Sequence, residues 1–190
     1  MKKAVLKQRR LRFDEIDALV QEITEETAEE YYRLPLPERR RRKELFWDSL
    51  LDFMIDGFAA GLLFIGEDKD FPEHYRFLDI TYPNGETVSQ IYDKDVPHRE
   101  KFRRMIEAES NRCWNTGLME AGRGAEGLMK TWETMEDNRV RDSHEILEGV
   151  TIPYDDEFIT FGGDSALAPG MFEEAQHNVN CRCWLSLHKR

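Results

Sequence analysis

The chain has 190 residues, of which 40% are hydrophobic and 34% are charged, so it holds enough apolar material for a folded core and too much for a disordered chain. Its formal net charge of −11 argues against a protein that binds DNA through its overall charge, because neutralising phosphates requires an excess of Lys and Arg. No apolar run is long enough to span a bilayer or to form a secretory signal, and three cysteines are too few for a disulfide scaffold. We therefore expect a protein of a reducing cytosol with no membrane contact.

Charged residues occur in blocks of one sign. Residues 14–30 carry acids and no base, and residues 142–174 carry nine acids and no Lys or Arg. Such blocks are typical both of solvated helix faces and of surfaces that contact a partner. The two basic runs are the candidate contacts for DNA or for an acidic neighbour, and they comprise Lys2, Lys3, Lys7, Arg9, Arg10 and Arg12 and then Arg39, Arg40, Arg41, Arg42 and Lys43.

The first third of the chain predicts two helices. Residues 4–33 and 38–65 each place apolar side chains at three- and four-residue steps, which is the pattern of an amphipathic helix. Pro35 and Pro37 separate the two, because proline cannot donate a helix hydrogen bond and restricts the residue before it. The pattern predicts a helical arm, an αα-hairpin, over residues 1–65.

The next segment predicts a β-hairpin connector over residues 66–98. Strand-like runs at 77–82 and 87–92 flank Asn84 and Gly85, and an Asn-Gly pair supplies the positive φ angles of a tight hairpin turn.

Residues 99–190 predict a small mixed domain. The expected elements are a helix at 98–121, strands at 129–134, 150–153 and 157–161, a short helix at 140–148 closed by Gly149, a loop at 162–170 and a terminal strand at 180–187. The expected fold class is α+β, a helical hairpin followed by a small mixed domain with short antiparallel strands.

Two polar segments, 132–149 and 177–183, contain the candidate catalytic and metal-binding residues. They contain His144, His177, Cys181 and Cys183, which are nitrogen and sulfur ligands of the types that zinc accepts. A Cys-x-Cys pair is tighter than the usual spacing of structural zinc sites, and on a strand it also places two core thiols on one face. A zinc site and a set of buried, hydrogen-bonded side chains are both compatible with this pattern.

Two enzymatic alternatives use the same segments. A metal-dependent hydrolase or nuclease would use His144, Asp137 and the Cys/His cluster, and a thiol enzyme would use Cys181 or Cys183 as its nucleophile. The sequence has no Gly-rich nucleotide-binding loop of the GxxxxGK[ST] or GxGxxG type.

A structural alternative assigns the charged side chains to an internal network. Asp137, Arg139, Arg141 and Asp142 are placed to form salt bridges and caps that fix a turn. On a strand, Arg182 points away from the two neighbouring cysteines, and we expect it to pair with the acidic stretch at 142–174.

These two segments also carry a family resemblance. The pattern Trp132, Asp137-x-Arg139-x-Arg141-Asp142-x-His144, Gly149 and Phe158, followed by Asn180-Cys181-Arg182-Cys183, resembles the signature of the Mu F-like minor head proteins of tailed bacteriophages. The resemblance covers about residues 100–185. Ile106–Asn111 stands where that family often has an A-R-T-E helix, and the Arg-Thr of that motif is replaced.

The resemblance implies a structural component of the phage head, located in the virion and in the host cytoplasm during assembly, and not an enzyme. It implies the portal protein and/or the major capsid protein as partners, possible DNA contact through the basic runs, and no required cofactor. Longer relatives carry fused toxin or enzyme modules. Seven residues follow Cys183, so we expect no such module here.

Together, pattern and resemblance predict a division of labour. The helical arm binds the portal or capsid, and truncation of residues 1–65 leaves the remaining domain folded. That domain is locked by a structural network of Trp132, Asp137, Arg139, Arg141, Asp142, His144, Asn180, Cys181, Arg182 and Cys183.

Overall fold

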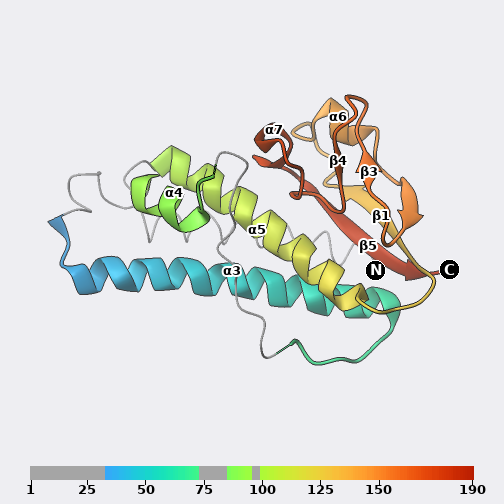
Figure 1. The fold of residues 1–190 in the computed structure, drawn as a ribbon, viewed down its shortest axis with the longest axis horizontal. Helices are drawn as coiled ribbons and strands as arrows, with labels where there is room; N and C mark the ends of the chain where they lie inside the picture. Colours follow the sequence, from blue (N-terminus) through green and yellow to red (C-terminus); the bar gives the residue numbers. More distant parts are fainter. Residues whose placement is uncertain (1–32, 73–84, 96–98) are drawn as a thin grey trace.

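The computed structural model describes residues 33–72, 85–95 and 99–190. Their elements are, in order, α3 (Leu36–Ile65), α4 (Val88–Asp95), α5 (Arg99–Gly122), β1 (Leu128–Thr134), α6 (Asp142–Glu145), β2 (Thr151–Pro153), β3 (Phe158–Ile159), β4 (Ser165–Ala166), α7 (Ala175–Asn178) and β5 (Cys183–Lys189). The long helices α3 and α5 lie side by side, and the strands gather at one end of the pair (Figure 1). The α+β class with short antiparallel strands is confirmed.

Helix α3 confirms the helix predicted at 38–65. It begins just after Pro35 and carries Pro37 in its first turn, where the missing N–H has no helical partner to lose. It ends at Gly66, whose left-handed φ of 68° lets its N–H bond the Leu62 carbonyl at 2.8 Å. The helix predicted at 4–33, and with it the αα-hairpin, lies outside the described residues.

The strand predicted at 87–92 is wrong, because α4 occupies this segment. The Thr87 hydroxyl accepts a hydrogen bond from the Gln90 N–H at 3.2 Å, and the Gln90 side-chain oxygen accepts one from the Thr87 N–H at 2.9 Å. This reciprocal capping box starts a helix and outweighs the β propensity of the apolar residues that follow. Val88 and Tyr92, four residues apart, are both buried. The predicted partner strand at 77–82 lies outside the described residues.

Helices α3 and α5 cross with their backbones in contact. A Cβ atom at Gly117 would overlap the Met54 carbonyl oxygen and lie 2.6 Å from the Phe58 nitrogen, and a Cβ at Gly57 would lie 2.8 Å from the Trp114 carbonyl carbon. Glycine on both helices is therefore what permits this close approach.

The core is continuous from the helix pair into the sheet. Ala60 of α3 joins Trp114 and Leu118 of α5 in the cluster that also holds Trp132 and Leu185 of the strands. A second cluster combines α3, α4 and α5 through Phe46, Leu50, Tyr92 and Ile106. The structure therefore argues against the expectation that truncating residues 1–65 leaves a folded domain, because removal of α3 would open both clusters.

The main sheet has the order β2-β1-β5, and both pairs are antiparallel. In the β1–β5 pair, Trp132 faces Leu185 and Thr134 faces Cys183. Strands β3 and β4 form a separate two-stranded hairpin, and β4 occupies part of the segment expected to be loop. Among the described residues, no helix combines the length and apolar character that crossing a bilayer requires.

Candidate functional site

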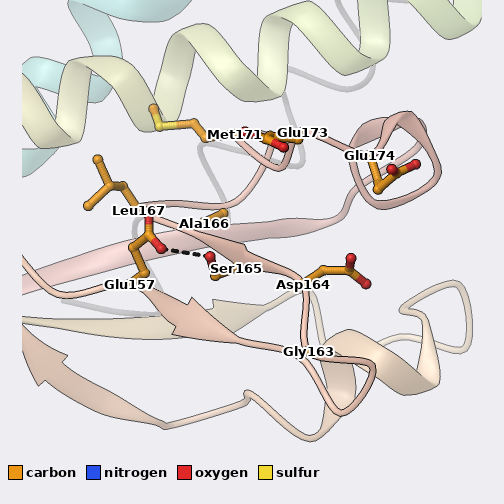
Figure 2. A pocket seen from close by; sticks show the side chains of 9 residues that line it. All are labelled: Glu157, Gly163, Asp164, Ser165, Ala166, Leu167, Met171, Glu173 and Glu174. Carbon is orange, nitrogen blue, oxygen red and sulfur yellow. Dashed lines mark hydrogen bonds between the residues drawn. The ribbon is translucent and has the colours of Figure 1, made fainter. Parts of the chain in front are cut away.

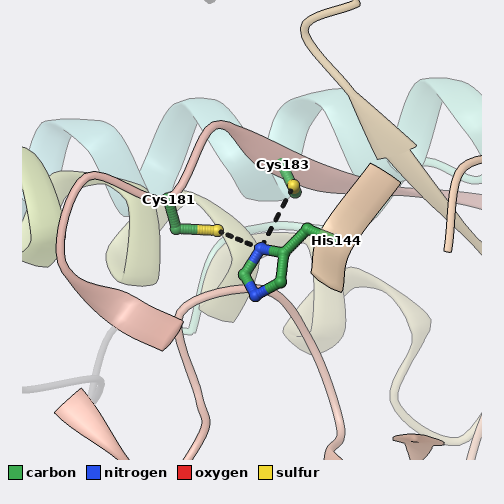
Figure 3. Close-up of side chains that lie close together, drawn as sticks. All are labelled: His144, Cys181 and Cys183. Atoms are coloured by element: carbon green, nitrogen blue, oxygen red, sulfur yellow. Dashed lines mark hydrogen bonds between the residues drawn. The ribbon is translucent and has the colours of Figure 1, made fainter. Parts of the chain in front are cut away.

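A buried histidine and two buried cysteines meet where α6 faces the start of β5. His144 comes from α6, Cys183 is the first residue of β5, and Cys181 lies just before that strand. His144 Nδ1 lies 3.6 Å from the Cys181 sulfur and 3.7 Å from the Cys183 sulfur (Figure 3). The three ligand atoms lie within 4.8 Å of one another, and each residue is at most 2% exposed.

Local backbone geometry brings these side chains together. Asn180 adopts a left-handed φ of 54° after α7, and the Cys181 N–H bonds the Asn178 carbonyl at 3.1 Å, so the chain turns sharply into β5. In the other segment, the His144 N–H donates a hydrogen bond to the Arg141 carbonyl at 2.9 Å, and this bond begins the single turn of α6. The NCRC segment is thus a turn followed by a strand.

A hydrogen-bonded chain of His144, His177 and Asp164, here called the histidine chain, leads away from the sulfurs. His144 Nε2 lies 3.3 Å from His177 Nδ1, and His177 Nε2 lies 3.0 Å from an Asp164 carboxylate oxygen. A carboxylate can only accept a hydrogen bond, so His177 donates its Nε2–H to Asp164. The Nδ1 atom of a neutral His177 then carries no proton and accepts a hydrogen bond from the Nε2–H of His144. Nδ1 of a neutral His144 is then an acceptor without a proton that faces both sulfurs.

Aromatic rings hold the His144 imidazole in place. The Trp132 ring meets it edge-on at 5.4 Å between centroids, and the Phe172 ring stacks on it at 5.5 Å and 22°. Both aromatic residues are buried. This packing fixes the direction of the imidazole and excludes water from its faces.

The pKa of the Cys181 thiol lies well below its usual value. The hydrogen bond with Cys183 lowers this pKa most, and burial opposes that effect; His144 lowers the pKa further in the state in which its imidazole is protonated and Nδ1 donates to the sulfur. Burial instead raises the pKa of Cys113, a free cysteine in α5, to about 12. The cluster therefore favours a thiolate at Cys181, and the thiolate is the form that binds metals and acts as a nucleophile.

Two arginines tie the α6 segment to the NCRC segment. Arg182 donates to the Asp137 carboxylate at 2.6 Å from its terminal nitrogen and at 2.9 Å from Nε. Arg141 donates to the carbonyls of His177, at 3.4 Å, and of Val179. The two sequence segments thus form one folded unit.

A pocket opens beside the β3–β4 hairpin, and acidic side chains dominate its wall (Figure 2). Glu157, Asp164, Glu173 and Glu174 line it, and the Ser165 hydroxyl donates to Glu157 at 2.6 Å. Asp164 belongs both to this wall and to the histidine chain. The buried cluster is therefore connected to the surface through one carboxylate.

The sequence model of the family described as Phage Mu protein F like protein matches residues 83–186, a span that contains α6, the histidine chain and both cysteines of the cluster. The chain belongs to the Phage Mu protein F-like family. This match confirms the resemblance drawn from the two sequence segments.

Two curated relatives of this Mu F-like chain differ in their names. The NAD(+)–arginine ADP-ribosyltransferase EFV of Enterococcus faecalis is 39% identical over 155 residues, which are 78% of this chain and 28% of that protein. The minor head protein GP7 of Bacillus phage SPP1 is 32% identical over 108 residues, which are 53% of this chain and 35% of that protein. The chain thus spans about a third or less of either relative, and no solved structure matches it.

The structure assembles most of the predicted structural network of this Mu F-like chain. Arg139, Asp142 and Asn180 are exposed, although the Arg139 N–H donates to Asp137 at 3.1 Å. The residues that come together are Trp132, Asp137, Arg141, His144, Cys181, Arg182 and Cys183.

The Arg182 side chain pairs with Asp137, which precedes the acidic stretch at 142–174. A pairing of Arg182 with that stretch stays a prediction. The Met135 N–H bonds the Arg182 carbonyl at 3.0 Å, so the β1–β5 pairing continues one step beyond the strands. The loop after β1 therefore runs beside Arg182 and presents Asp137 to it.

His177 does not join the predicted set of zinc ligands. Its Nδ1 faces Nε2 of His144, on the side of the imidazole opposite the sulfurs. The residues with ligand atoms close together are His144, Cys181 and Cys183. His177 instead orients His144 from behind.

The hydrolase and nuclease set is not assembled as predicted. The Asp137 carboxylate is engaged by the Arg182 guanidinium, whereas His144 is 1% exposed and faces the two sulfurs. A substrate would have to displace packed aromatic rings to reach this imidazole.

Some residues of the second basic run form ion pairs within the fold. Arg42 is buried and pairs with Glu38 at 3.3 Å, and Lys43 pairs with Asp93 at 2.8 Å. Arg40 and Arg41 are exposed. Contact of this run with DNA or a partner stays a prediction. The first basic run lies outside the described residues.

Two residues that matter to the site were missed from sequence. Asp164 ends the histidine chain, but an isolated acid in a Gly-rich loop carries no motif. Asn115 of α5 bonds the backbone of β5 and is fully buried. A usable signal existed for Asn115, because it lies one helical turn after Asn111 and between the apolar residues Trp114 and Leu118.

Proposed function

We propose that this chain acts as a minor head protein of a tailed bacteriophage and serves in head morphogenesis as a structural component. The observation that carries this proposal is the family match over residues 83–186, which overlaps the half of the chain related to the minor head protein GP7 of phage SPP1. The family-matched span includes both site segments.

The geometry supports a structural role over a catalytic one. The His144, Cys181 and Cys183 cluster is at most 2% exposed, and the Asp137 carboxylate is held by Arg182. Catalytic groups must touch a substrate, whereas these groups touch one another. They lock a rigid unit, which suits a component that must keep its shape in a larger assembly.

The proposed setting is the phage head, reached by assembly in the host cytoplasm. The proposed neighbours are the portal protein and the major capsid protein. Large exposed apolar side chains support contact with another protein, because Phe161 is 93% exposed and Ile159 of β3 is 63% exposed on the same hairpin.

An ADP-ribosyltransferase activity is not proposed for this chain. That name belongs to a relative of which the chain spans 28%. Incubation of the purified chain with NAD⁺ and an arginine-containing acceptor protein is therefore expected to transfer no ADP-ribose. Transfer that depends on the chain would overturn the structural assignment.

The decisive experiment follows the protein into particles. In the phage or prophage that encodes the chain, procapsids and mature heads are purified and their proteins are cross-linked and identified by mass spectrometry. We expect the chain in at least one particle type, cross-linked to the portal or the major capsid protein. Its absence from both, at normal intracellular abundance, would refute the proposal.

A matched pair of variants tests the proposed contact surface. Phe161→Ser changes the hairpin tip, whereas Ile146→Ser changes another exposed apolar residue at the end of α6, where 55% of Ile146 is exposed. We expect Phe161→Ser alone to reduce incorporation into heads. Equal incorporation of both variants would place the contact elsewhere.

A further inference from the structure

We propose that His144, Cys181 and Cys183 bind one zinc ion through the His144 Nδ1 atom and the two sulfurs. The proposal does not rest on the proposed head function. Thiolate and imidazole are the donors that zinc prefers in protein sites. Cys181 and Cys183 follow His144 by 37 and 39 residues in the chain, so the fold brings together donors from two separate segments.

The distances fit a tetrahedral ion. Zinc–sulfur bonds of about 2.3 Å and zinc–nitrogen bonds of about 2.0 Å at tetrahedral angles place each sulfur about 3.5 Å from the nitrogen. The observed separations from His144 Nδ1 are 3.6 Å to Cys181 and 3.7 Å to Cys183. Both nitrogen–sulfur separations therefore fit, and the two sulfurs, which lie within 4.8 Å of one another, would sit about 3.8 Å apart around a tetrahedral ion.

The two sulfurs also lie at nearly the same distance from one ring nitrogen. The His144 Nδ1 atom has one lone pair, which accepts one well-aligned hydrogen bond. Two thiols nonetheless approach it at nearly equal distances. Near-equal approach of two sulfurs to one imidazole nitrogen is also what a shared metal ion requires.

The histidine chain prepares His144 as a ligand. Histidines that bind metals nearly always donate their other ring N–H to a partner, which fixes the tautomer and the ring direction. His144 has that partner in His177, which is itself oriented by Asp164. The chain leaves Nδ1 free of a proton on the side of the sulfurs.

Three protein ligands leave one tetrahedral position for a water molecule. The ligands are at most 2% exposed and lie among aromatic rings, so the ion acts as an internal cross-link between α6 and the start of β5. Such a cross-link stabilises the folded chain because the unfolded chain has no preformed site.

The first test measures metal content. The full chain, purified without a metal-binding tag, is analysed for zinc by mass spectrometry of the elements, and the zinc is then exchanged for Co²⁺. We expect one zinc per chain, and a thiolate-to-cobalt charge-transfer band in the near ultraviolet after exchange. A folded chain that takes up neither ion at micromolar concentration would overturn the proposal.

Variants assign the ligands. Cys181→Ser and Cys183→Ser are expected to lose the charge-transfer band or reduce it strongly, whereas Cys113→Ser, at a buried free cysteine outside the cluster, is expected to retain it. Equal loss in all three variants would point to unfolding and not to ligation.

A fourth variant avoids that ambiguity. Asp164→Asn leaves every ligand in place and changes a partly exposed residue, so we expect it to fold. Loss of an outer hydrogen-bond partner typically weakens metal binding about 10- to 100-fold, and we expect a loss in this range in competition with a chelator. An unchanged metal affinity would show that the histidine chain does not support metal binding.

Thiol reactivity separates the metal site from a reactive-thiol site. With zinc bound, alkylation of Cys181 and Cys183 is expected to be slow and to accelerate after chelation. Rapid alkylation of the chain as purified, with zinc absent, would instead support a reactive thiolate–imidazole pair and refute the metal site.

Discussion

Asn115 connects α5 to the outer edge of the main sheet. Within the described part of the chain, strand β5 pairs with β1 on one side only, and Asn115 meets backbone groups on its other side. Its side-chain nitrogen donates to the Cys183 carbonyl at 3.3 Å, and its side-chain oxygen accepts from the Leu185 N–H at 3.1 Å. We expect Asn115→Ala to uncouple the helix from the strand that carries Cys183.

The size of the effect follows from these contacts. Each lost hydrogen bond costs about 1 kcal/mol, and a buried backbone group left without a partner adds about 1–3 kcal/mol. Asn115 is fully buried, so water does not readily replace the amide. The expected loss is about 2–4 kcal/mol in the free energy of unfolding.

Urea unfolding followed by tryptophan fluorescence measures this loss, because Trp114 and Trp184 are buried beside the contact. Thr116→Ala is the matched control on the same helix. The Thr116 hydroxyl donates to the Arg112 carbonyl of its own helix at 2.8 Å, so its loss is expected to cost less than about 1 kcal/mol. If the two variants lost equal stability, the assignment of Asn115 as the link would be refuted.

Three further predictions concern packing and charge. Gly117→Ala should lower the thermal midpoint, because overlap with the α3 backbone costs about 1–3 kcal/mol or more and outweighs the gain of about 1 kcal/mol in helix propensity. Asp137→Asn and Arg182→Gln should show a coupling energy of about 1–2 kcal/mol in a double-mutant cycle at pH 7. Burial raises the pKa of Asp137, but the hydrogen bonds from Arg182 and from the Arg139 N–H, together with the charges of both arginines, outweigh it and hold the pKa below its usual value, so this coupling should be lost as the pH falls below about 4. Burial lowers the pKa of Lys130 to about 8, so the unfolded chain binds more protons between about pH 8 and 10 and this residue makes the fold more stable as the pH rises. Lys130→Met should therefore lack the rise in stability that the parent chain shows between about pH 8 and 10 in denaturant titrations, and at lower pH it also loses the hydrogen bond from Lys130 Nζ to the Leu167 carbonyl at 2.8 Å.

The outcomes that contradict these predictions are distinct. A higher thermal midpoint for Gly117→Ala would mean that the helices separate freely. Additive effects of the Asp137 and Arg182 variants would mean that their bridge contributes no stability. A pH-independent difference between Lys130→Met and the parent chain would mean that this amine titrates normally.

Sequence patterns predicted the elements that are long or strongly periodic. Helices α3 and α5 follow from sustained three- and four-residue spacing, and β1 and β5 follow from apolar strand segments. The segment at 87–92 was wrong because apolar periodicity in a short run is ambiguous. The Thr87-x-x-Gln90 cap decides that ambiguity, and a capping box can be recognised from sequence.

The site was predicted in its residues but not in its geometry. The pairing of the two signature segments could be inferred, whereas the direction of each ring nitrogen depends on tertiary contacts. His177 illustrates the limit, because its residue type suits a ligand and its position behind His144 does not. Asp164 acts through a hydrogen bond with His177 and Asn115 through two bonds with the backbone of β5, and local spacing does not encode which distant groups such bonds join.

The glycine-mediated crossing of α3 and α5 has a mechanical consequence. At Gly57 and Gly117 the two backbones touch with no side chain between them, so the helices resist sliding past each other at this crossing. Helix α5 alone, with 24 residues, spans about 36 Å between α4 and the sheet. In a particle under internal pressure, a load applied at one end of this pair would reach the other end as a displacement and would not be absorbed by bending.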